Sequence, residues 1–363
     1  MKIALIIITA AFIVQGCTNS SPQNYTARNK NIVYAGLTEK LENEVILIGS
    51  ASSATSYFTG DTCVIFLRNY NEEGRYNYYS IELDNEDLGR FKINGDEMKA
   101  IPIAITFQKE IHKISVYKST EAAIGSINFG GIFCEKLVEP EKQPLKNIEF
   151  IGNSITCGMG DDTLAVPCNA NQWYDQHNAY WAYGPTVSRA LKVNFLLSSV
   201  SGIGIYRNWN SNGPTMPEVY ENLYLNTDES QKRDFSTFTP NVVSICLGTN
   251  DFSDGDGLKE RLPFDSIHFT SNYIHFIEIV YSHYPETQIA LLNSPMLKED
   301  KNPLLDNCLH AVKEHFDSTN YIPIEIFHFN EITPHGCDGH PDIDDQMLMA
   351  DQLYPFYKRL LEK

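Results

Sequence analysis

Residues 147–156 have the sequence NIEFIGNSIT, in which an apolar segment ends in a glycine, an asparagine and a serine. We predict a strand over Asn147 to Ile151, the first of a parallel sheet, because predicted strands and helices alternate after it. Functional side chains of open parallel sheets gather at the carboxyl ends of the strands. Ser154 is therefore a candidate nucleophile, although a serine at this place can also serve only as a helix cap.

The rest of the chain after residue 145 supports a sheet covered by helices on both faces. The predicted strands and helices follow one another in the order helix Tyr180 to Leu191, strand Val193 to Leu197, strand Asn241 to Leu247, helix Phe264 to His283, strand Gln288 to Leu292 and helix Asp342 to Leu361. This alternation predicts an α/β domain over residues 145–363.

The N-terminal part has a different pattern. Short alternating segments, such as Cys63 to Leu67 and Lys113 to Tyr117, are separated by turn residues such as Asn94-Gly95-Asp96. No long segment with a helical period interrupts them. The pattern predicts an all-β jelly-roll sandwich over residues 31–140, and the proline- and charge-rich segment from Glu139 to Pro144 is the predicted linker.

The composition limits the class of partner. Hydrophobic residues make up 42% of the chain and charged residues 20%, as in packed globular proteins, and the formal net charge is −18. Such an acidic surface repels phosphate backbones and anionic lipid headgroups, so we expect no nucleic-acid partner. It is compatible with uncharged sugars as substrates, and equally with a simple contribution to solubility.

The first residues predict export. Lys2 precedes an apolar run from Ile3 to Val14, and Gln15-Gly16-Cys17 follows, so residues 1–17 have the pattern of a signal peptide. The end of this segment resembles a lipobox, which implies a lipid on Cys17 as the only membrane contact. Gln15 is unusual in a lipobox, so ordinary secretion is the alternative to a cell-envelope lipoprotein.

Export also permits disulfides. Removal of Cys17 from the eight cysteines leaves seven, so at least one stays free. Cys157 and Cys168 flank a loop beside the candidate nucleophile and are the first candidates for a bridge. No CxxC and no cluster of cysteine and histidine has the spacing of zinc ligands, and we expect neither a metal nor another cofactor.

Two further segments follow predicted strands. Val200-Ser201-Gly202-Ile203-Gly204 comes after the second strand, and Gly248-Thr249-Asn250-Asp251 after the third. Ester hydrolysis builds negative charge on the former carbonyl oxygen, which requires hydrogen-bond donors held in place. Each segment alone would suit a turn. Together with Ser154, the N–H of Gly202 and the side-chain amide of Asn250 form a candidate oxyanion hole.

The last block is Gly336-Cys337-Asp338-Gly339-His340-Pro341, just before the C-terminal helix. A histidine in a loop at this edge of the sheet is the natural general base for Ser154. We therefore assign this role to His340, and His335 remains on the list of candidates.

These four blocks resemble those of the SGNH (GDSL-like) hydrolases, with Gly152-Asn153-Ser154 in place of the usual GDS. A jelly-roll domain followed by a hydrolase domain is similar to carbohydrate esterase family 2, which deacetylates xylan and related oligosaccharides. The resemblance implies a flavodoxin-like parallel sheet, a serine esterase and an acetylated polysaccharide or oligosaccharide as substrate.

One position departs from the family pattern. Many SGNH enzymes have an aspartate three residues before the histidine, where this chain has Cys337, while Asp338 lies two residues before it. The resemblance allows two partners for the imidazole of His340: the carboxylate of Asp338, or a backbone carbonyl between Cys337 and Gly339.

The remaining candidates concern the substrate. Trp173 and Trp209 lie near the motif blocks and could stack on sugar rings, although such residues more often pack in loops. Asp251 could bind a substrate hydroxyl or cap the next helix. The alternatives to a carbohydrate deacetylase are another SGNH-type esterase or lipase and a non-catalytic glycan-binding lipoprotein. A glycosidase would need two facing carboxylates, for which we find no motif.

Overall fold

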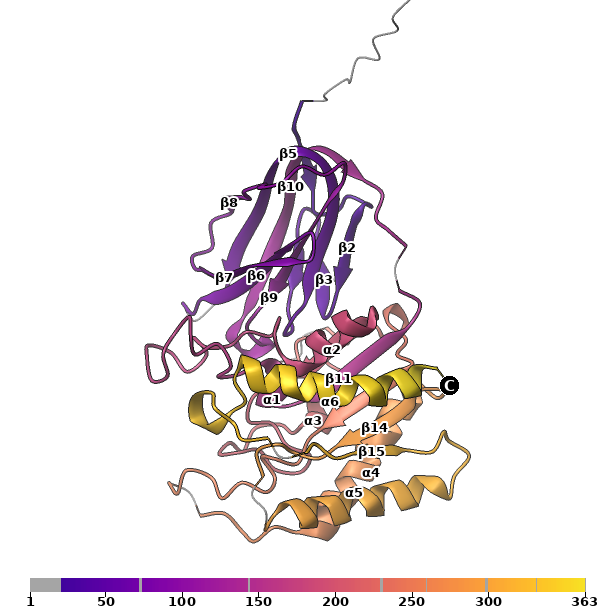
Figure 1. Cartoon of the computed structure of the whole chain (residues 1–363). Coiled ribbons are helices and arrows are strands. Elements are labelled where there is room, and N and C mark those ends of the chain that lie inside the picture. Colours follow the sequence, from indigo (N-terminus) through magenta and orange to yellow (C-terminus); the bar gives the residue numbers. More distant parts are fainter. Residues whose placement is uncertain are drawn as a thin grey trace, which may run out of the picture.

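The computed structural model describes residues 21–362, apart from residues 72–73, 143, 229–230, 259, 298–299 and 331. The predicted signal peptide and Cys17 lie outside the described residues. The chain forms an N-terminal β-sandwich and a C-terminal α/β domain, and Figure 1 shows the sandwich seated on one side of the α/β domain. Within the described part, no helix has the length and apolar character that a membrane span requires.

The sandwich confirms the predicted all-β domain. Its strands are joined in the order β3-β4-β10-β5-β9-β6-β7, and all of the pairs are antiparallel. Its strands are β1 (Gln23–Thr26), β2 (Ile32–Ala35), β3 (Thr38–Lys40), β4 (Val45–Leu47), β5 (Ser53–Tyr70), β6 (Asn77–Leu83), β7 (Glu86–Ile93), β8 (Lys99–Pro102), β9 (His112–Lys118) and β10 (Ser126–Val138).

The two long strands, β5 and β10, run through the whole sandwich. Their pairing is interrupted by bulges between Phe129 and Gly131 and between Cys134 and Lys136. Bulges bend and twist a strand, so the same two strands can take part in both layers. Alternate residues of β5, such as Cys63, Ile65 and Leu67, are buried between the layers, as the period of two predicts.

The α/β domain has a parallel sheet in the order β12-β11-β13-β14-β15, which confirms the predicted class. The strands are β11 (Asn147–Gly152), β12 (Asn194–Ser199), β13 (Val242–Cys246), β14 (Gln288–Leu292) and β15 (Glu325–Phe327). The helices are α1 (Ser154–Cys157), α2 (Tyr183–Leu191), α3 (Met216–Val219), α4 (Ser266–His283), α5 (Asn302–Asp317) and α6 (Ile343–Leu361).

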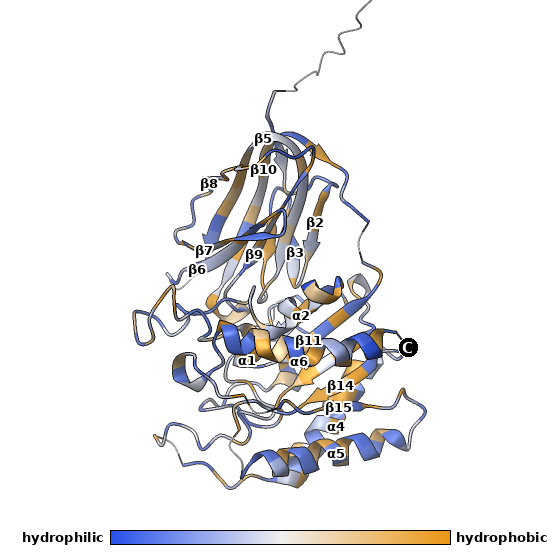
Figure 2. Cartoon of the chain, in the orientation of Figure 1, coloured by the Kyte–Doolittle hydropathy of each residue, from blue (hydrophilic) through white to orange (hydrophobic). Residues whose placement is uncertain are grey.

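Helices cover both faces of this sheet. Ile151 and Ile245 point toward α4 and α5, whereas Ile148 and Phe150 point toward α2 and α6, because side chains alternate along a strand. Figure 2 shows the strands around β14 as hydrophobic and the outer side of α5 as largely hydrophilic. The sheet is thus buried on both faces, which is why its strands are near-continuous apolar runs in the sequence.

The two domains share a continuous contact. Leu37, Ile46 and Ile48 of the sandwich belong to the same core cluster as α4 and α5. Polar bonds cross the boundary as well; they join Arg90 to Asp162, Tyr76 and Tyr78 to Asp175, Tyr180 to Glu82, and Tyr224 to Glu39. The sandwich is therefore packed firmly against the domain that holds the candidate site.

The predicted disulfide between Cys157 and Cys168 is wrong. Cys168 is bonded to Cys337, 169 residues away in the sequence. Cys157 lies in α1, is buried, and donates a hydrogen bond through its thiol to Ser199 at 3.2 Å. The helical turn directs the Cys157 side chain into the core, so it cannot reach the loop that carries Cys168.

Candidate active site

The candidate nucleophile lies in a tight turn at the carboxyl end of β11. Gly152 ends the strand, and a side chain there would collide with Thr156. Asn153 caps α1, because its Oδ1 accepts a hydrogen bond from the N–H of Ile155 at 3.1 Å. Ser154 is the first residue of α1, 7% exposed, and its hydroxyl group faces a cavity.

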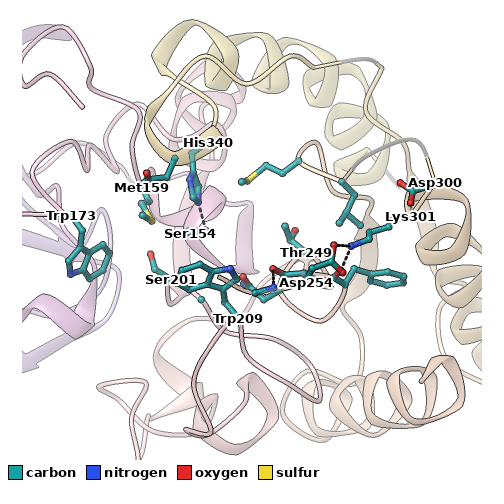
Figure 3. A pocket seen from close by; sticks show the side chains of 18 residues that line it. Ser154, Met159, Trp173, Ser201, Trp209, Thr249, Asp254, Asp300, Lys301 and His340 are labelled. Carbon is teal, nitrogen blue, oxygen red and sulfur yellow. Dashed lines mark hydrogen bonds and ion pairs between the residues drawn. The ribbon is translucent and has the colours of Figure 1, made fainter. Parts of the chain in front are cut away.

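His340 is in contact with this serine, as predicted. The two atoms, Nε2 of His340 and Oγ of Ser154, are 2.8 Å apart (Figure 3). Nδ1 of His340 lies 3.1 Å from the carbonyl oxygen of Cys337. Since a carbonyl only accepts, Nδ1 carries the proton and Nε2 is free to accept the proton of the Ser154 hydroxyl.

Of the two partners considered for His340, the backbone carbonyl is the one in contact. Asp338 adopts a positive φ of 54°, and this exposed residue lines the cavity instead. His335, the other histidine on the list, is on the surface and pairs with Asp345 at 2.9 Å. Ser154 and His340 thus form a dyad whose imidazole is oriented by the main chain.

Burial lowers the pKa of the candidate general base, His340. His340 is 8% exposed, and burial lowers its pKa below the usual value of 6.5, while the carbonyl of Cys337 acts in the opposite direction. The imidazole is therefore neutral at pH 7, the form that can take a proton from a hydroxyl group.

Ser154, Gly202 and Asn250 line the same cavity, and each offers a hydrogen-bond donor. The loop after β12 brings Gly202, at φ 77°, to the cavity wall, and Asn250 after β13 lies beside it. One amide hydrogen of Asn250 is bound by the carbonyl of Ile203 at 2.7 Å, which leaves the second for a ligand. The N–H of Ser154, at the first position of a helix, has no intrahelical acceptor. These three donors together can stabilise the oxyanion that forms during ester hydrolysis.

The cavity has a volume of about 960 Å³, and the dyad lies in its wall. Trp173 and Trp209 line the same cavity, and both indole side chains are nearly half exposed (Figure 3). Lys301, which forms an ion pair with Asp254 at 2.7 Å, lies farther along the same cavity. The other lining residues are Met159, Ser201, Gly202, Thr249, Asn250, Phe252, Ser253, Gly255, Met296, Leu297, Asp300 and Asp338.

The predicted role of Asp251 in substrate binding or helix capping is wrong. Its side chain is fully buried, and it accepts hydrogen bonds from the backbone N–H groups of Ile205, Tyr206 and Arg207 at 2.9 to 3.1 Å. The carboxylate therefore holds the loop after Gly202 and has no free oxygen directed at the cavity. The sequence shows that Asp251 follows Asn250 directly, but it does not show whether the Asp251 side chain points into the cavity or toward the loop after Gly202.

Two clusters on the described part of the chain have the donor atoms for a metal ion, and neither includes Ser154 or His340. One is formed by Asp306, His310 and His328, and the other by His335, Asp342 and Asp345. In the second cluster, Asp342 and Asp345 form the capping box of α6, so local hydrogen bonds already account for them.

Several cavity residues were not found from the sequence. Met159, Phe252 and Met296 belong to no motif, and Lys301 lies at the start of a helix that the sequence analysis did not predict. Glu121, in the sandwich domain, contacts the Ser201–Gly202 loop from outside the cavity. No local sequence signal connects these residues with Ser154.

Comparison with known families agrees with the domain division. Residues 36–144 match the family described as carbohydrate esterase 2 N-terminal, and residues 148–353 match the GDSL-like lipase/acylhydrolase family. The boundary between the two matches lies between the sandwich and the first strand of the α/β domain.

Curated relatives are esterases. An acetylxylan esterase/glucomannan deacetylase of Cellvibrio japonicus is 27% identical over 247 residues, which cover 67% of this chain and 68% of the relative. The cellulase/esterase CelE of Acetivibrio thermocellus is 29% identical over 291 residues, which cover 78% of this chain but only 34% of that longer protein.

Solved structures show the same two-domain fold. A family two carbohydrate esterase from Clostridium thermocellum, solved in complex with cellohexaose, superposes with a TM-score of 0.79 at 26% identity, over 91% of this chain and 99% of that chain. A family two carbohydrate esterase from Cellvibrio japonicus superposes with a TM-score of 0.82 at 20% identity, over 94% and 99% of the two chains.

Proposed function

The chain belongs to the GDSL-like lipase/acylhydrolase family, in carbohydrate esterase family 2, and on this premise we propose that it releases acetate from acetylated xylan or related hemicellulose oligosaccharides. It is a carboxylic ester hydrolase, and the contact between the Ser154 hydroxyl and the His340 imidazole carries the proposal for its mechanism. The names of the curated relatives support acetylated polysaccharide as the substrate class.

The first half of the proposed reaction acylates the enzyme. Nε2 of His340 takes the proton of the Ser154 hydroxyl while Oγ forms a bond to the acetyl carbonyl carbon. The negative charge on the former carbonyl oxygen is stabilised by the N–H groups of Ser154 and Gly202 and the amide of Asn250. His340 then gives its proton to the sugar oxygen, the ester bond breaks, and the deacetylated sugar leaves.

The second half restores the serine. Water replaces the sugar, His340 takes one of its protons, and the hydroxide oxygen bonds to the acyl carbon. The same donors hold the second oxyanion. The proton returns to Oγ of Ser154 as the bond between Oγ and the acyl carbon breaks, and acetic acid leaves and ionises to acetate. The carbonyl of Cys337 keeps the required tautomer of His340 throughout, and its dipole favours the transient imidazolium.

Aromatic side chains support a sugar as the alcohol part of the ester. The indole rings of Trp173 and Trp209 line the cavity that also holds the dyad (Figure 3). Indole faces pack well on the apolar faces of sugar rings, and the net charge of −18 does not disfavour a neutral glycan.

The cavity wall also favours a second candidate, an esterase for longer acyl chains. Met159, Phe252, Met296 and Leu297 give part of this wall an apolar character that an acetyl methyl group does not need. Rates on acetylated xylo-oligosaccharides, p-nitrophenyl acetate and p-nitrophenyl octanoate distinguish the two. A carbohydrate deacetylase prefers the first substrate, whereas a longer-chain esterase prefers the octanoate.

The disulfide supports the proposed export of the protein. Cys168–Cys337 is a structural bond in a chain whose first residues resemble a lipoprotein signal, and such bonds persist in oxidising compartments. Cell fractionation, with labelling by a radioactive fatty acid in wild type and Cys17→Ala, tests this proposal. Label on the wild type alone supports a lipid on Cys17, while an unlabelled protein in the medium supports ordinary secretion.

A further inference from the structure

Glu121 is a carboxylate of the sandwich domain that lies against the loop carrying Gly202. It follows β9, precedes the short 3-10 helix η1 (Ala122–Ile124), and is 1% exposed. Its Oε2 accepts a hydrogen bond from the N–H of Ser201 at 3.1 Å, and the Ser201 hydroxyl donates to the same oxygen. The two residues are 80 positions apart in the sequence, so these bonds join the two domains at the candidate site.

Ser201 controls the direction of one oxyanion donor. Its carbonyl group and the N–H of Gly202 belong to one planar peptide unit, so the direction of that N–H follows from how Ser201 and Gly202 are held on the two sides of the unit. On the far side, the carbonyl of Gly202 accepts a hydrogen bond from the N–H of Trp209 at 2.8 Å. Glu121 supplies the anchor on the near side. Ser201 and Trp209 both line the cavity near Ser154 (Figure 3).

The backbone of Glu121 is itself held firmly. The side chain of Lys118, at the end of β9, is fully buried, and its Nζ donates to the carbonyl oxygens of Thr120 and Glu121 at 2.8 and 2.7 Å. Burying an amino group is costly, and its two carbonyl partners offset part of that cost. The sandwich thus presents Glu121 at a defined position.

The carboxylate of Glu121 also contacts the loop that carries Trp173. Nε2 of His177 lies 3.5 Å from Oε2 of Glu121, and the ring of His177 packs edge-on against Trp173 with centroids 5.2 Å apart. Burial alone would raise the pKa of Glu121, but His177 and Ser201 lower it below its usual value, so the carboxylate is charged at neutral pH. A charged acceptor makes the stronger hydrogen bonds.

We propose that Glu121 is a positioning residue of the esterase, through which the sandwich domain sets the direction of the Gly202 N–H in the oxyanion hole. The proposal rests on the proposed function of Ser154, Gly202 and His340. It assigns to the N-terminal domain a part in the chemical step, in addition to any part in binding glycan.

The expected effect has a definite sign. A negative charge near the site opposes formation of an oxyanion, so its removal alone would raise the rate of acylation. A loss of rate on removal of Glu121 therefore has to come from lost positioning. Loss of a direct oxyanion donor costs about 100- to 1,000-fold in kcat, and we expect about 10- to 100-fold for a residue that positions one donor.

The experiment compares four variants by kcat and KM on p-nitrophenyl acetate, with the melting temperature of each. Glu121→Ala should lower kcat by about 10- to 100-fold with KM changed by less than about threefold, because the donor acts in the transition state. Glu121→Gln keeps one acceptor and should recover part of this loss. Ser201→Ala keeps the backbone bond to Glu121 and should lose less than Glu121→Ala.

Glu39→Ala is the matched control. Glu39, in β3, is another carboxylate that bridges the two domains, and it binds Tyr224 at 2.6 Å and Gln231 at 2.5 Å away from the cavity. It should keep the wild-type kcat even if the melting temperature falls. If Glu121→Ala does not fold, the graded losses of Glu121→Gln and Ser201→Ala provide the test.

A second measurement separates this inference from the proposed substrate. A fluorophosphonate reacts with the nucleophilic serine by displacement of fluoride, and the phosphoryl oxygen occupies the oxyanion hole. The labelling rate should fall about tenfold or more in Glu121→Ala relative to wild type. A wild type that is labelled but releases no acetate from any glycan contradicts only the proposed substrate. Wild-type kcat and labelling rate in both Glu121 variants would overturn the role of Glu121.

Discussion

The carbonyl oxygen of Cys337 lies 3.1 Å from Nδ1 of His340, and it occupies the place that an aspartate takes in a serine triad. The same residue is bonded through its sulfur to Cys168. The main-chain atom that orients the base is thus held in place by a disulfide to the loop that carries Trp173. We therefore expect the stability of that loop and the efficiency of catalysis to be coupled in this chain.

The disulfide should support both stability and rate. We expect the double variant Cys168→Ser/Cys337→Ser to lose about 2–5 kcal/mol of unfolding free energy, because the bond closes a long segment of chain. Its kcat should also fall several-fold, since the carbonyl of Cys337 becomes free to move. Chemical denaturation and p-nitrophenyl acetate hydrolysis measure the two effects. Dithiothreitol should slow the wild type and leave the double variant unchanged; equal kcat in both proteins would contradict the coupling.

Asp338 should have a small effect on the rate. Because a carbonyl already orients His340, we expect Asp338→Asn to keep kcat within about tenfold of wild type, whereas loss of a triad aspartate costs about 10,000-fold. Steady-state kinetics on p-nitrophenyl acetate decide the matter. A fall of a thousandfold or more would show that the Asp338 carboxylate is the third member of a triad.

The acid limb of the pH profile should report His340. Burial lowers its pKa below 6.5, and only the neutral imidazole can take the proton of Ser154. Activity is therefore complete above this lowered pKa and is lost as the pH falls through it. Profiles of kcat/KM between pH 4 and 8 should have their midpoint below pH 6.5. A midpoint above that value would contradict the burial of a neutral base.

The two tryptophans should act on sugar substrates only. Trp173→Ala and Trp209→Ala should each raise KM for acetylated xylo-oligosaccharides by about 3- to 10-fold, the loss expected for one aromatic contact. Hydrolysis of p-nitrophenyl acetate, which has no sugar ring, provides the control and should change little. Equal changes on both substrates would indicate that the indoles serve only to pack the loops.

The sequence was sufficient to predict the fold class and to bring together the residues of the dyad. Ser154, Gly202 and Asn250 each follow a strand of one parallel sheet, and parallel strands place their carboxyl ends at one edge. His340 was found because it precedes the last helix at the same edge. These predictions rest on the periodicity of each segment, on the alternation of strands and helices along the chain, and on the resemblance of the four blocks to those of SGNH hydrolases.

Other features could not be predicted because they depend on contacts between distant segments. The partner of Cys168 is 169 residues away, and Glu121 meets Ser201 across a domain boundary. Asp251 was misassigned because sequence position does not tell whether a side chain faces a cavity or its own loop. The edge strand β15 has only three half-buried residues and therefore gives a weak signal.

The helix α5 was missed although the sequence contains a signal for it. Its buried residues Leu305, Cys308, Leu309, Val312 and Phe316 follow the helical period, so the signal was present in the sequence. The helix matters for the site, because Lys301 at its N-terminal end lies in the cavity wall.

The most direct test of the central claim is acetate release from acetylated xylo-oligosaccharides and acetylated mannan by wild type and Ser154→Ala in parallel. The contact of 2.8 Å between Ser154 and His340 predicts release by the wild type and none above background by the variant. An unchanged melting temperature in the variant would show that only the nucleophile was lost. Equal release by both proteins, or release by neither, would contradict the assignment of a serine-dependent carbohydrate deacetylase.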